Sequence, residues 1–308
     1  MQHVEEVVVG LDALFDTLDC LRDQPREVVA LDGGLTNRNY RVTTPERDVV
    51  VRVSHKDDSL LAIDRSAEHA NSRAAAASGA APAVLEYSPE HSLLVVAYVS
   101  GRTFDADDMR DPGNLPRVSA VCRQLHAGPR FVTDFDMFEV QRRYLDTVLE
   151  HGFKLPDGYL DLGPTVDRIR VALAADEVAT VPCNNDLLAA NVIDDGTRLW
   201  LIDYEYAGNN DPCFELGNLA SESNLSVAEL TALVSAYFDA ERPAKIARTR
   251  LLGAMAQYGW MLWASIQAAT SGIEFDFWSW GMEKYDRAVE TLAGDELDAL
   301  LSAAQRPD

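Results

Sequence analysis

The segment that most constrains the fold of this chain is residues 183–206, CNNDLLAANVIDDGTRLWLIDYEY. Its two short apolar runs, separated by an Asp-Asp-Gly turn, are typical of a pair of β-strands. Asp186 and Asn191 stand before the first run, and Asp203 follows the second. Small polar side chains at the ends of an apolar strand usually face a cleft, and all three are oxygen donors. A plain loop with Asn and Asp as turn residues explains each of them, but not their joint spacing.

Three oxygen donors at this spacing suit in-line phosphoryl transfer. That reaction needs a carboxylate that orients or deprotonates the attacking hydroxyl, and oxygen ligands that hold Mg²⁺ on the phosphates. We therefore predict that Asp186 is the catalytic base and that Asn191 and Asp203 are magnesium ligands. Mg²⁺ prefers such hard oxygen donors and usually keeps several waters as well.

A glycine turn in the first part of the chain is a candidate phosphate-binding loop. Predicted strands at 28–31 and 40–42 flank Gly33-Gly34. Glycine lets backbone N–H groups approach phosphate oxygens, and Thr36 and Asn37 could donate further hydrogen bonds. We predict that Gly34, Thr36 and Asn37 contact the nucleotide, although a Gly-Gly pair in a hairpin is more often only a turn.

Arg52 lies in a third predicted strand, DVVVRVS, where its β-branched neighbours point to the opposite face. An inward-facing cation there would hold nucleotide phosphates if a carboxylate positioned it. Glu68, on the alanine-rich helix predicted for 63–77, is the candidate. An edge-strand arginine that faces water is the alternative.

Composition excludes several classes of protein. The 308 residues carry a net charge of −23, which repels nucleic acid and anionic membranes. The sequence contains no run of about 18 apolar residues, so it predicts no membrane span. The four cysteines are scattered without a CxxC pair, which argues against a zinc site or a disulfide framework. Because the first residues lack the basic charge of a signal peptide, we expect a cytoplasmic protein. Nothing in the sequence specifies an oligomeric state.

Predicted strands are concentrated before Gly101, and predicted helices follow it. Helices are predicted over residues 3–22, 63–77, 114–127, 137–151 and 164–176, and over most of 226–308 with breaks near Pro243 and Gly272. We therefore predict an α+β, two-lobed, protein-kinase-like fold. Residues 1–99 would form a nucleotide-binding lobe, and residues 100–308 a helical lobe with the catalytic loop and the acceptor pocket.

The motif NNDLLAANVI…LWLIDYEYAGNNDPCFELGNLASE resembles that of the choline/ethanolamine kinases, a branch of the aminoglycoside-phosphotransferase superfamily with a protein-kinase-like fold. The likeness also covers GGLTNRNYRV, the Arg52 strand, Glu68, HSLLVVAYVSGRTF, QLHAGPRF and WMLWASIQAATSGIEFDFWSW, so it spans nearly the whole chain. It implies a hinge at Ala97–Val99, where Ala97 and Val99 offer backbone groups to adenine.

Two residues depart from the pattern of that family. Asn184 stands where the family has a histidine that braces the catalytic loop rather than doing chemistry, so we expect activity to survive with altered positioning. Glu215 replaces the usual aspartate of Phe-Asp-Ile-Gly-Asn, which leaves open how that loop is held. Since Asp186, Asn191 and Asp203 are all present, the sequence does not indicate a pseudokinase.

Aromatic residues near the C-terminus bear on the acceptor. Trp260 and Trp263 are three residues apart on a predicted helix, so they share one face. A quaternary ammonium cannot donate a hydrogen bond, and proteins hold it with aromatic faces worth ~0.5–2 kcal/mol each. The resemblance implies such an aromatic box, with an acidic residue at Glu222. The predicted acceptor pocket comprises Glu205, Tyr206, Glu222, Trp260, Trp263, Phe275, Phe277 and Trp280. Packing of the helical lobe is the alternative explanation.

The leading functional hypothesis is an ATP- and Mg²⁺-dependent kinase that phosphorylates the hydroxyl of choline or a related amino alcohol such as ethanolamine. Choline is favoured modestly, because a primary ammonium wants acceptors for its three N–H groups. An aminoglycoside, thiamine or amino-sugar kinase keeps the fold but needs carboxylates more than aromatic rings. A non-catalytic binding protein of kinase shape is the third hypothesis, with Asn184 as its support.

Overall fold

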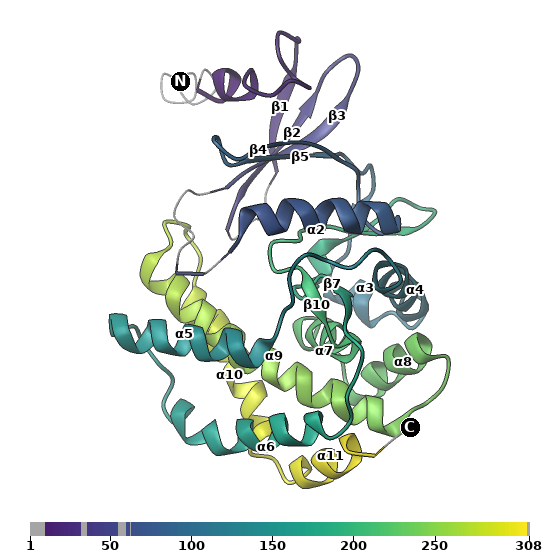
Figure 1. The fold of residues 1–308 in the computed structure, drawn as a ribbon, viewed down its shortest axis with the longest axis vertical. Coiled ribbons are helices and arrows are strands. Elements are labelled where there is room, and N and C mark those ends of the chain that lie inside the picture. Colours follow the sequence, from purple (N-terminus) through teal and green to yellow (C-terminus); the bar gives the residue numbers. More distant parts are fainter. Residues whose placement is uncertain (1–9, 32–35, 55–59, 62, 307–308) are drawn as a thin grey trace.

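A computed structural model describes residues 10–31, 36–54, 60–61 and 63–306. One part of the molecule is a five-stranded antiparallel sheet with the strand order β1-β2-β3-β5-β4 (Figure 1). The strands are β1 (Glu27–Leu31), β2 (Arg38–Thr43), β3 (Asp48–Val53), β4 (Val84–Ser88) and β5 (Leu93–Ala97). Alternate residues of β2 and β3 are buried, as expected for strands with one face on a core.

The N-terminal segment packs on this sheet, but it is less helical than predicted. Residues 10–15 are helical and residues 16–23 form turns, while residues 1–9 lie outside the described residues. Phe15, Leu18 and Leu21 are fully buried against the sheet. The chain leaves the helix after Phe15, so Leu18 and Leu21 reach the sheet from the turns that follow.

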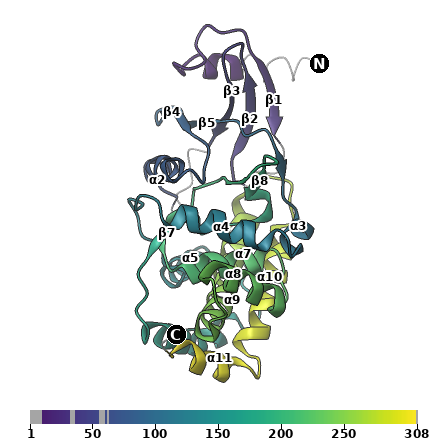
Figure 2. The same cartoon turned by 90° about the vertical axis from the view of Figure 1, so that its right-hand side faces the viewer.

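Helix α2 (Arg65–Ser78) lies between the sheet and the helical part of the molecule (Figures 1 and 2). The side chain of Asp64 caps its first turn by accepting the N–H groups of Ser66 and Ala67. It ends at Gly79, whose φ of 81° lies in the left-handed region that terminates helices. This placement directs Glu68, which is buried, towards β3.

The second part of the molecule is mainly helical, as predicted. Its helices are α3 (Ala106–Arg110), α4 (Leu115–His126), α5 (Met137–His151), α6 (Gly163–Ala174), α7 (Pro212–Glu222), α8 (Val227–Phe238), α9 (Pro243–Thr270), α10 (Phe277–Leu292) and α11 (Leu297–Ala304), with 3-10 turns η1 (Tyr159–Leu162) and η2 (Ala189–Asn191). The short strands β6 (Arg102–Thr103), β7 (Val181–Cys183), β8 (Val192–Asp194), β9 (Leu199–Leu201) and β10 (Gly208–Asn210) complete it. The two strands around the Asp-Asp-Gly turn pair as predicted.

Helices α7 and α9 form the centre of this part. The sequence analysis did not predict α7, because residues 212–220 are buried all round and so show no amphipathic period. Gly217 of α7 and Gly253 of α9 meet directly, since a Cβ on Gly217 would lie 2.7 Å from the backbone nitrogen of Gly253. None of the described helices combines the length and the apolar character that crossing a bilayer requires.

Candidate active site

The loop that follows β7 carries Asp186 and is held by a buried carboxylate. Glu215 of α7 is fully buried, and its two oxygens accept the backbone N–H groups of Asn184 and Asn185, both at 2.8 Å. Asn185 has a φ of 67°, in the left-handed region that Asn tolerates better than most residues. Glu215, one of the two departures from the family motif, therefore holds the loop by its backbone.

Asn184, the second departure, connects the loop to the segment after β9. Its side-chain amide donates to the carbonyl oxygens of Ile202 at 3.2 Å and Asp203 at 2.6 Å. Its Oδ1 accepts the backbone N–H of Asp186 at 3.1 Å. This asparagine thus links the backbones of Asp186 and Asp203, which is the bracing task assigned to the histidine of the resembling family.

Behind this loop lies a polar cluster that the spacing of the cysteines did not predict. His126, Cys183 and Glu215 are buried, and one potential ligand atom from each lies within 4.8 Å of the others. Both Glu215 oxygens already accept backbone N–H groups, and His126 Nδ1 lies 2.7 Å from the Tyr237 hydroxyl. These hydrogen bonds give the cluster a structural role in supporting the loop.

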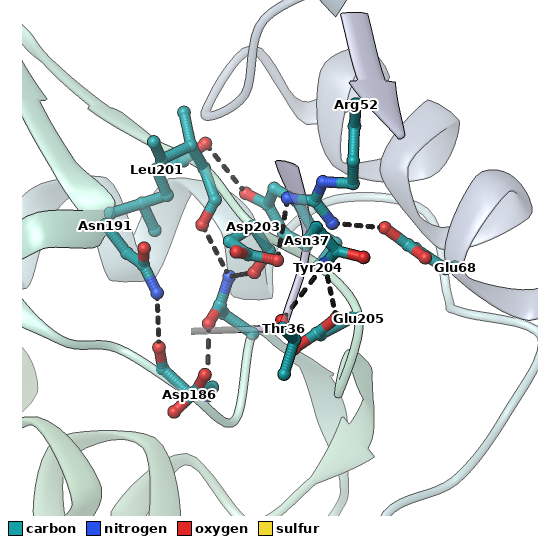
Figure 3. A network of polar contacts seen from close by, with 12 residues as sticks. Thr36, Asn37, Arg52, Glu68, Asp186, Asn191, Leu201, Asp203, Tyr204 and Glu205 are labelled. Atoms are coloured by element: carbon teal, nitrogen blue, oxygen red, sulfur yellow. Dashed lines mark hydrogen bonds and ion pairs between the residues drawn. The ribbon is translucent and has the colours of Figure 1, made fainter. Parts of the chain in front are cut away.

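The three oxygen donors that the sequence singled out lie together at one cavity (Figure 3). Asn191 Nδ2 donates to the backbone oxygen of Asp186 at 2.8 Å, which leaves the amide oxygen available. Asp203 adopts a φ of 64°, so the chain turns sharply where its side chain enters the cleft. Burial, together with the nearby carboxylate of Glu222, raises the pKa of Asp186 well above its ordinary value.

Arg52 connects the sheet to this cluster. Its guanidinium forms an ion pair with Glu68 of α2, and its Nη2 lies 2.8 Å from Oδ1 of Asp203 (Figure 3). The Arg52 side chain is 12% exposed, so it faces the cleft rather than water. The contact between Arg52 and Glu68 that we expected is present, and it places a fixed cation beside a proposed magnesium ligand.

Glu205 joins the two parts of the molecule across the cleft. Its carboxylate accepts from the Thr36 hydroxyl at 2.8 Å, from Asn37 Nδ2 at 2.8 Å and from Arg65 Nη1 at 3.1 Å. Burial and the adjacent Asp203 carboxylate raise its pKa despite these donors. Thr36 and Asn37, predicted to bind phosphate, here bind protein, and the predicted contact at Gly34 lies outside the described residues.

A cavity of about 340 Å³ lies between the sheet and the loops of the helical part. The predicted hinge residues Ala97 and Val99 line it, together with Arg52, Asn191 and Asp203. Sequence reasoning missed most of its apolar wall, to which Val50, Leu94, Val96, Ile193 and Ile202 contribute. A cavity with an apolar wall and with Arg52 and Asp203 among its lining residues suits a nucleotide.

A second cavity, of about 90 Å³, opens beside Asp186 and Asp203. Its wall includes three indole rings, from Trp260 and Trp263 of α9 and Trp280 of α10. Hydrogen bonds orient the first two rings, because Trp260 Nε1 donates to Asn218 Oδ1 and Trp263 Nε1 donates to the Tyr206 hydroxyl, each at 2.8 Å. Further lining side chains include Glu205, Tyr206 and Glu222.

Two predicted aromatic residues are not on the wall of this cavity. Phe277 is 3% exposed and packs edge to face against Trp263, with ring centroids 5.7 Å apart. Phe275 is 42% exposed and contacts Phe277. In this structure Phe277 supports Trp263 from behind, and neither ring belongs to the wall of the cavity beside Asp186. Helix α10 begins at Phe277, so its next turn brings Trp280 to the cavity instead.

Two charged residues at the site escaped the sequence analysis. Arg65, three residues before Glu68 on α2, bonds to both Glu68 and Glu205. Lys284, four residues after Trp280 on α10, places its ammonium 3.9 Å from the Trp280 ring centroid and contacts Glu222. The i,i+3 spacing of Arg65 and Glu68 and the i,i+4 spacing of Trp280 and Lys284 were visible in the sequence and would have indicated these two contacts.

Comparisons with known proteins agree with this arrangement. The family model of the phosphotransferase enzyme family matches residues 27–252. Ethanolamine kinase 1 of Mus musculus is 25% identical, with 85% of this chain and 84% of that protein covered. LicA, solved in complex with AMP, is 25% identical, with a TM-score of 0.73 and 92% and 97% of the two chains covered.

A choline/ethanolamine kinase family protein of Mesorhizobium loti, known from a crystal structure, has 30% identity and a TM-score of 0.85. The alignment covers 97% of this chain and 99% of that one. This agreement over the whole chain confirms the two-lobed, protein-kinase-like fold. The chain therefore belongs to the phosphotransferase enzyme family and, within it, to the choline/ethanolamine kinases, so it is an enzyme, a kinase that transfers phosphoryl groups.

Proposed function

We propose that this kinase transfers the γ-phosphoryl group of ATP, with Mg²⁺, to the hydroxyl of choline or of a related small amino alcohol such as ethanolamine. One observation carries the proposal: the carboxylate of Asp186 and three indole rings line the same small cavity. A ligand with a cationic head among the rings would extend its hydroxyl towards that carboxylate. The combination suits a short amino alcohol.

In the proposed reaction Asp186 accepts the proton of the acceptor hydroxyl. The acceptor oxygen forms a bond to the γ-phosphorus as the bond to the β,γ-bridging oxygen breaks, so that ADP leaves. Because burial raises the pKa of Asp186, its ionised form is a stronger proton acceptor than an exposed carboxylate. The bonds from Glu215 and Asn184 hold the backbone of the loop during this step.

The groups around the phosphates suit a nucleotide bound with a divalent metal. The amide oxygen of Asn191 and the carboxylate of Asp203 are hard donors on one wall, and they would hold Mg²⁺. The metal would supply positive charge that reduces the repulsion between the phosphate oxygens and the attacking acceptor oxygen. Arg52, fixed by Glu68, would bind phosphate oxygens, and the backbone at Ala97 and Val99 would receive adenine.

Choline is the preferred acceptor in this proposal, by a modest margin. The cavity offers aromatic faces, whereas the side chains of Glu205 and Glu222 are already bonded to cations of the protein. A primary ammonium would therefore find few free acceptors for its three N–H groups. The related proteins carry the names of both choline and ethanolamine kinases, which agrees with only a small difference in affinity between the two acceptors.

An acceptor panel in a coupled ADP-release assay tests the proposal. The panel contains choline, ethanolamine, thiamine, glucosamine and kanamycin, each with ATP and Mg²⁺. We expect choline and ethanolamine to give the highest kcat/KM. A large excess for an amino sugar would contradict the role of the aromatic wall, and the absence of turnover with both amino alcohols would overturn the proposed acceptor class.

Two substitutions test the assigned roles. D186N should lower kcat by ~10²–10⁴-fold and leave nucleotide affinity nearly unchanged, because the side chain acts on the acceptor proton. The control is D107N, since the side chain of Asp107 is 93% exposed. W260L should raise the KM for choline about tenfold and that for ATP little. W278L provides the matched control, because Trp278 does not line the cavity. Equal effects of W260L on both KM values would make Trp260 structural.

A further inference from the structure

The cavity of about 90 Å³ beside Asp186 is the proposed acceptor site, and we call it the acceptor cavity. Its wall has more negative charge than one small cation needs. Four carboxylates line it, from Asp186, Asp203, Glu205 and Glu222. Left uncompensated, this wall would attract polycationic acceptors more strongly than singly charged ones. The question is which of these charges the protein neutralises with its own cations.

Lys284 neutralises Glu222 from within the helical part. Its ammonium contacts both carboxylate oxygens, with a distance of 2.6 Å to Oε1, and it lies 3.9 Å from the centroid of the Trp280 ring. The two charged side chains are only 8% and 4% exposed. Water therefore screens this pair weakly, and the two opposite charges compensate each other at the cavity wall.

Two other carboxylates have cation partners. Arg52 pairs with Asp203, and Arg65 pairs with Glu205, although each of these arginines also contacts Glu68. Asp186 differs, because within the part of the chain that the structure describes its side chain forms no ion pair. With Lys284 in place, the wall thus presents one carboxylate without a cation partner, next to the three indole rings.

We propose that Lys284 determines acceptor specificity by restricting the cavity to alcohols that carry a single positive charge. The inference rests on the proposed function and names the class of substrate that the same site accepts. The ammonium of Lys284 lies against Glu222, where the second ammonium of a dicationic acceptor would otherwise bind. A dication entering the wild-type cavity meets the lysine charge, and Asp186, the carboxylate without a cation partner, is the one that the acceptor hydroxyl contacts in the proposed reaction.

Replacing Lys284 by glutamine removes the charge but keeps a polar chain of similar bulk. Glu222 then becomes a buried carboxylate without a partner, which is strongly unfavourable until another cation reaches it. A diamino alcohol can supply that cation with its second ammonium, whereas a monoamino alcohol can do so only by moving its single ammonium from its place among the indole rings. We expect K284Q to shift the ratio of dissociation constants about tenfold in favour of the dication.

The experiment compares ethanolamine with 1,3-diamino-2-propanol, which adds a second ammonium to the same kind of alcohol. Binding is measured by calorimetry at pH 7, in the presence of Mg²⁺ and a non-hydrolysable ATP analogue. The variants are K284Q, K284R and the control K154Q, whose lysine lies over the Trp278 ring and does not line the cavity. K284R and K154Q should keep the wild-type ratio.

The ratio separates charge from packing, because a merely structural loss at Lys284 would weaken both probes alike. If wild-type enzyme binds ethanolamine and K284Q keeps the wild-type ratio, this inference is overturned and the proposed function stands. If the wild type binds neither probe nor choline, the proposed function itself fails. If K284Q does not fold, E222Q provides the test. This substitution leaves the charge of Lys284 without a partner, so the binding of the dication should weaken more than that of the monocation. The opposite order would refute the role of Lys284.

Discussion

Substituting Glu215 by glutamine is the most direct test of how the catalytic loop is held. The carboxylate is fully buried and accepts the N–H groups of Asn184 and Asn185 at 2.8 Å each. Glutamine is nearly isosteric and retains one acceptor oxygen, but its amide nitrogen would face the other N–H group. One hydrogen bond to a charged acceptor is lost, about 1.5–3 kcal/mol, and a buried donor remains unsatisfied, about 1–3 kcal/mol.

We therefore expect E215Q to lower the free energy of unfolding by about 2.5–6 kcal/mol. Urea unfolding followed by tryptophan fluorescence measures this loss, because the midpoint and the slope together give the free energy. E229Q is the matched control: Glu229 also accepts a backbone N–H, from Ser226 at 2.7 Å, but at an exposed helix start. Its substitution should cost no more than about 1 kcal/mol.

The same variant should alter catalysis selectively. Asp186 directly follows the two residues whose backbone Glu215 binds, so its displacement should lower kcat. The KM for ATP should change little, because the hinge and Arg52 belong to the sheet side of the cleft. An E215Q enzyme that loses less than about 1 kcal/mol of stability and keeps its kcat would refute the claim that this carboxylate positions the loop.

Two further predictions concern stability. G217A should destabilise the enzyme by about 1–3 kcal/mol, because a Cβ there would lie 2.5 Å from a backbone oxygen of α9, near Gly253; G272A, at an unconstrained position, is the control for thermal unfolding. Glu86 accepts two backbone N–H groups, which outweigh burial and lower its pKa. Its contribution should be present above about pH 4.5 and vanish as the pH falls through the lowered pKa, so urea midpoints of wild type and E86Q should converge in acid.

Much of the site could be predicted from the sequence, because its chemistry depends on residue type and local spacing. Asn191 and Asp203 flank the paired strands β8 and β9, and a strand pair brings the ends of its members together, while Asp186 lies in the loop that follows β7. Trp260 and Trp263 share a helix face for a similarly local reason. Apolar periodicity indicated helices at 114–127 and 137–151 within a residue or two of α4 and α5.

Other features depended on contacts between residues far apart in the chain. Helix α7 has no amphipathic pattern because it is buried all round, so only the packed structure shows it. Glu205 appeared to be an acid for the acceptor, yet it bonds to Thr36, 169 positions earlier. Phe275 and Phe277 were assigned to the pocket on proximity in sequence, whereas the start of α10 turns them away from it.

The amino-acid sequence by itself determined the two-lobed fold and the three oxygen donors, since hydrophobic period and side-chain chemistry are local properties of the chain. Only the tertiary structure decided which carboxylates carry an unpaired charge, because an ion pair depends on where helices and strands meet in space. Arg52 with Asp203, and Lys284 with Glu222, come from different elements, and the charge that an acceptor meets follows from those encounters.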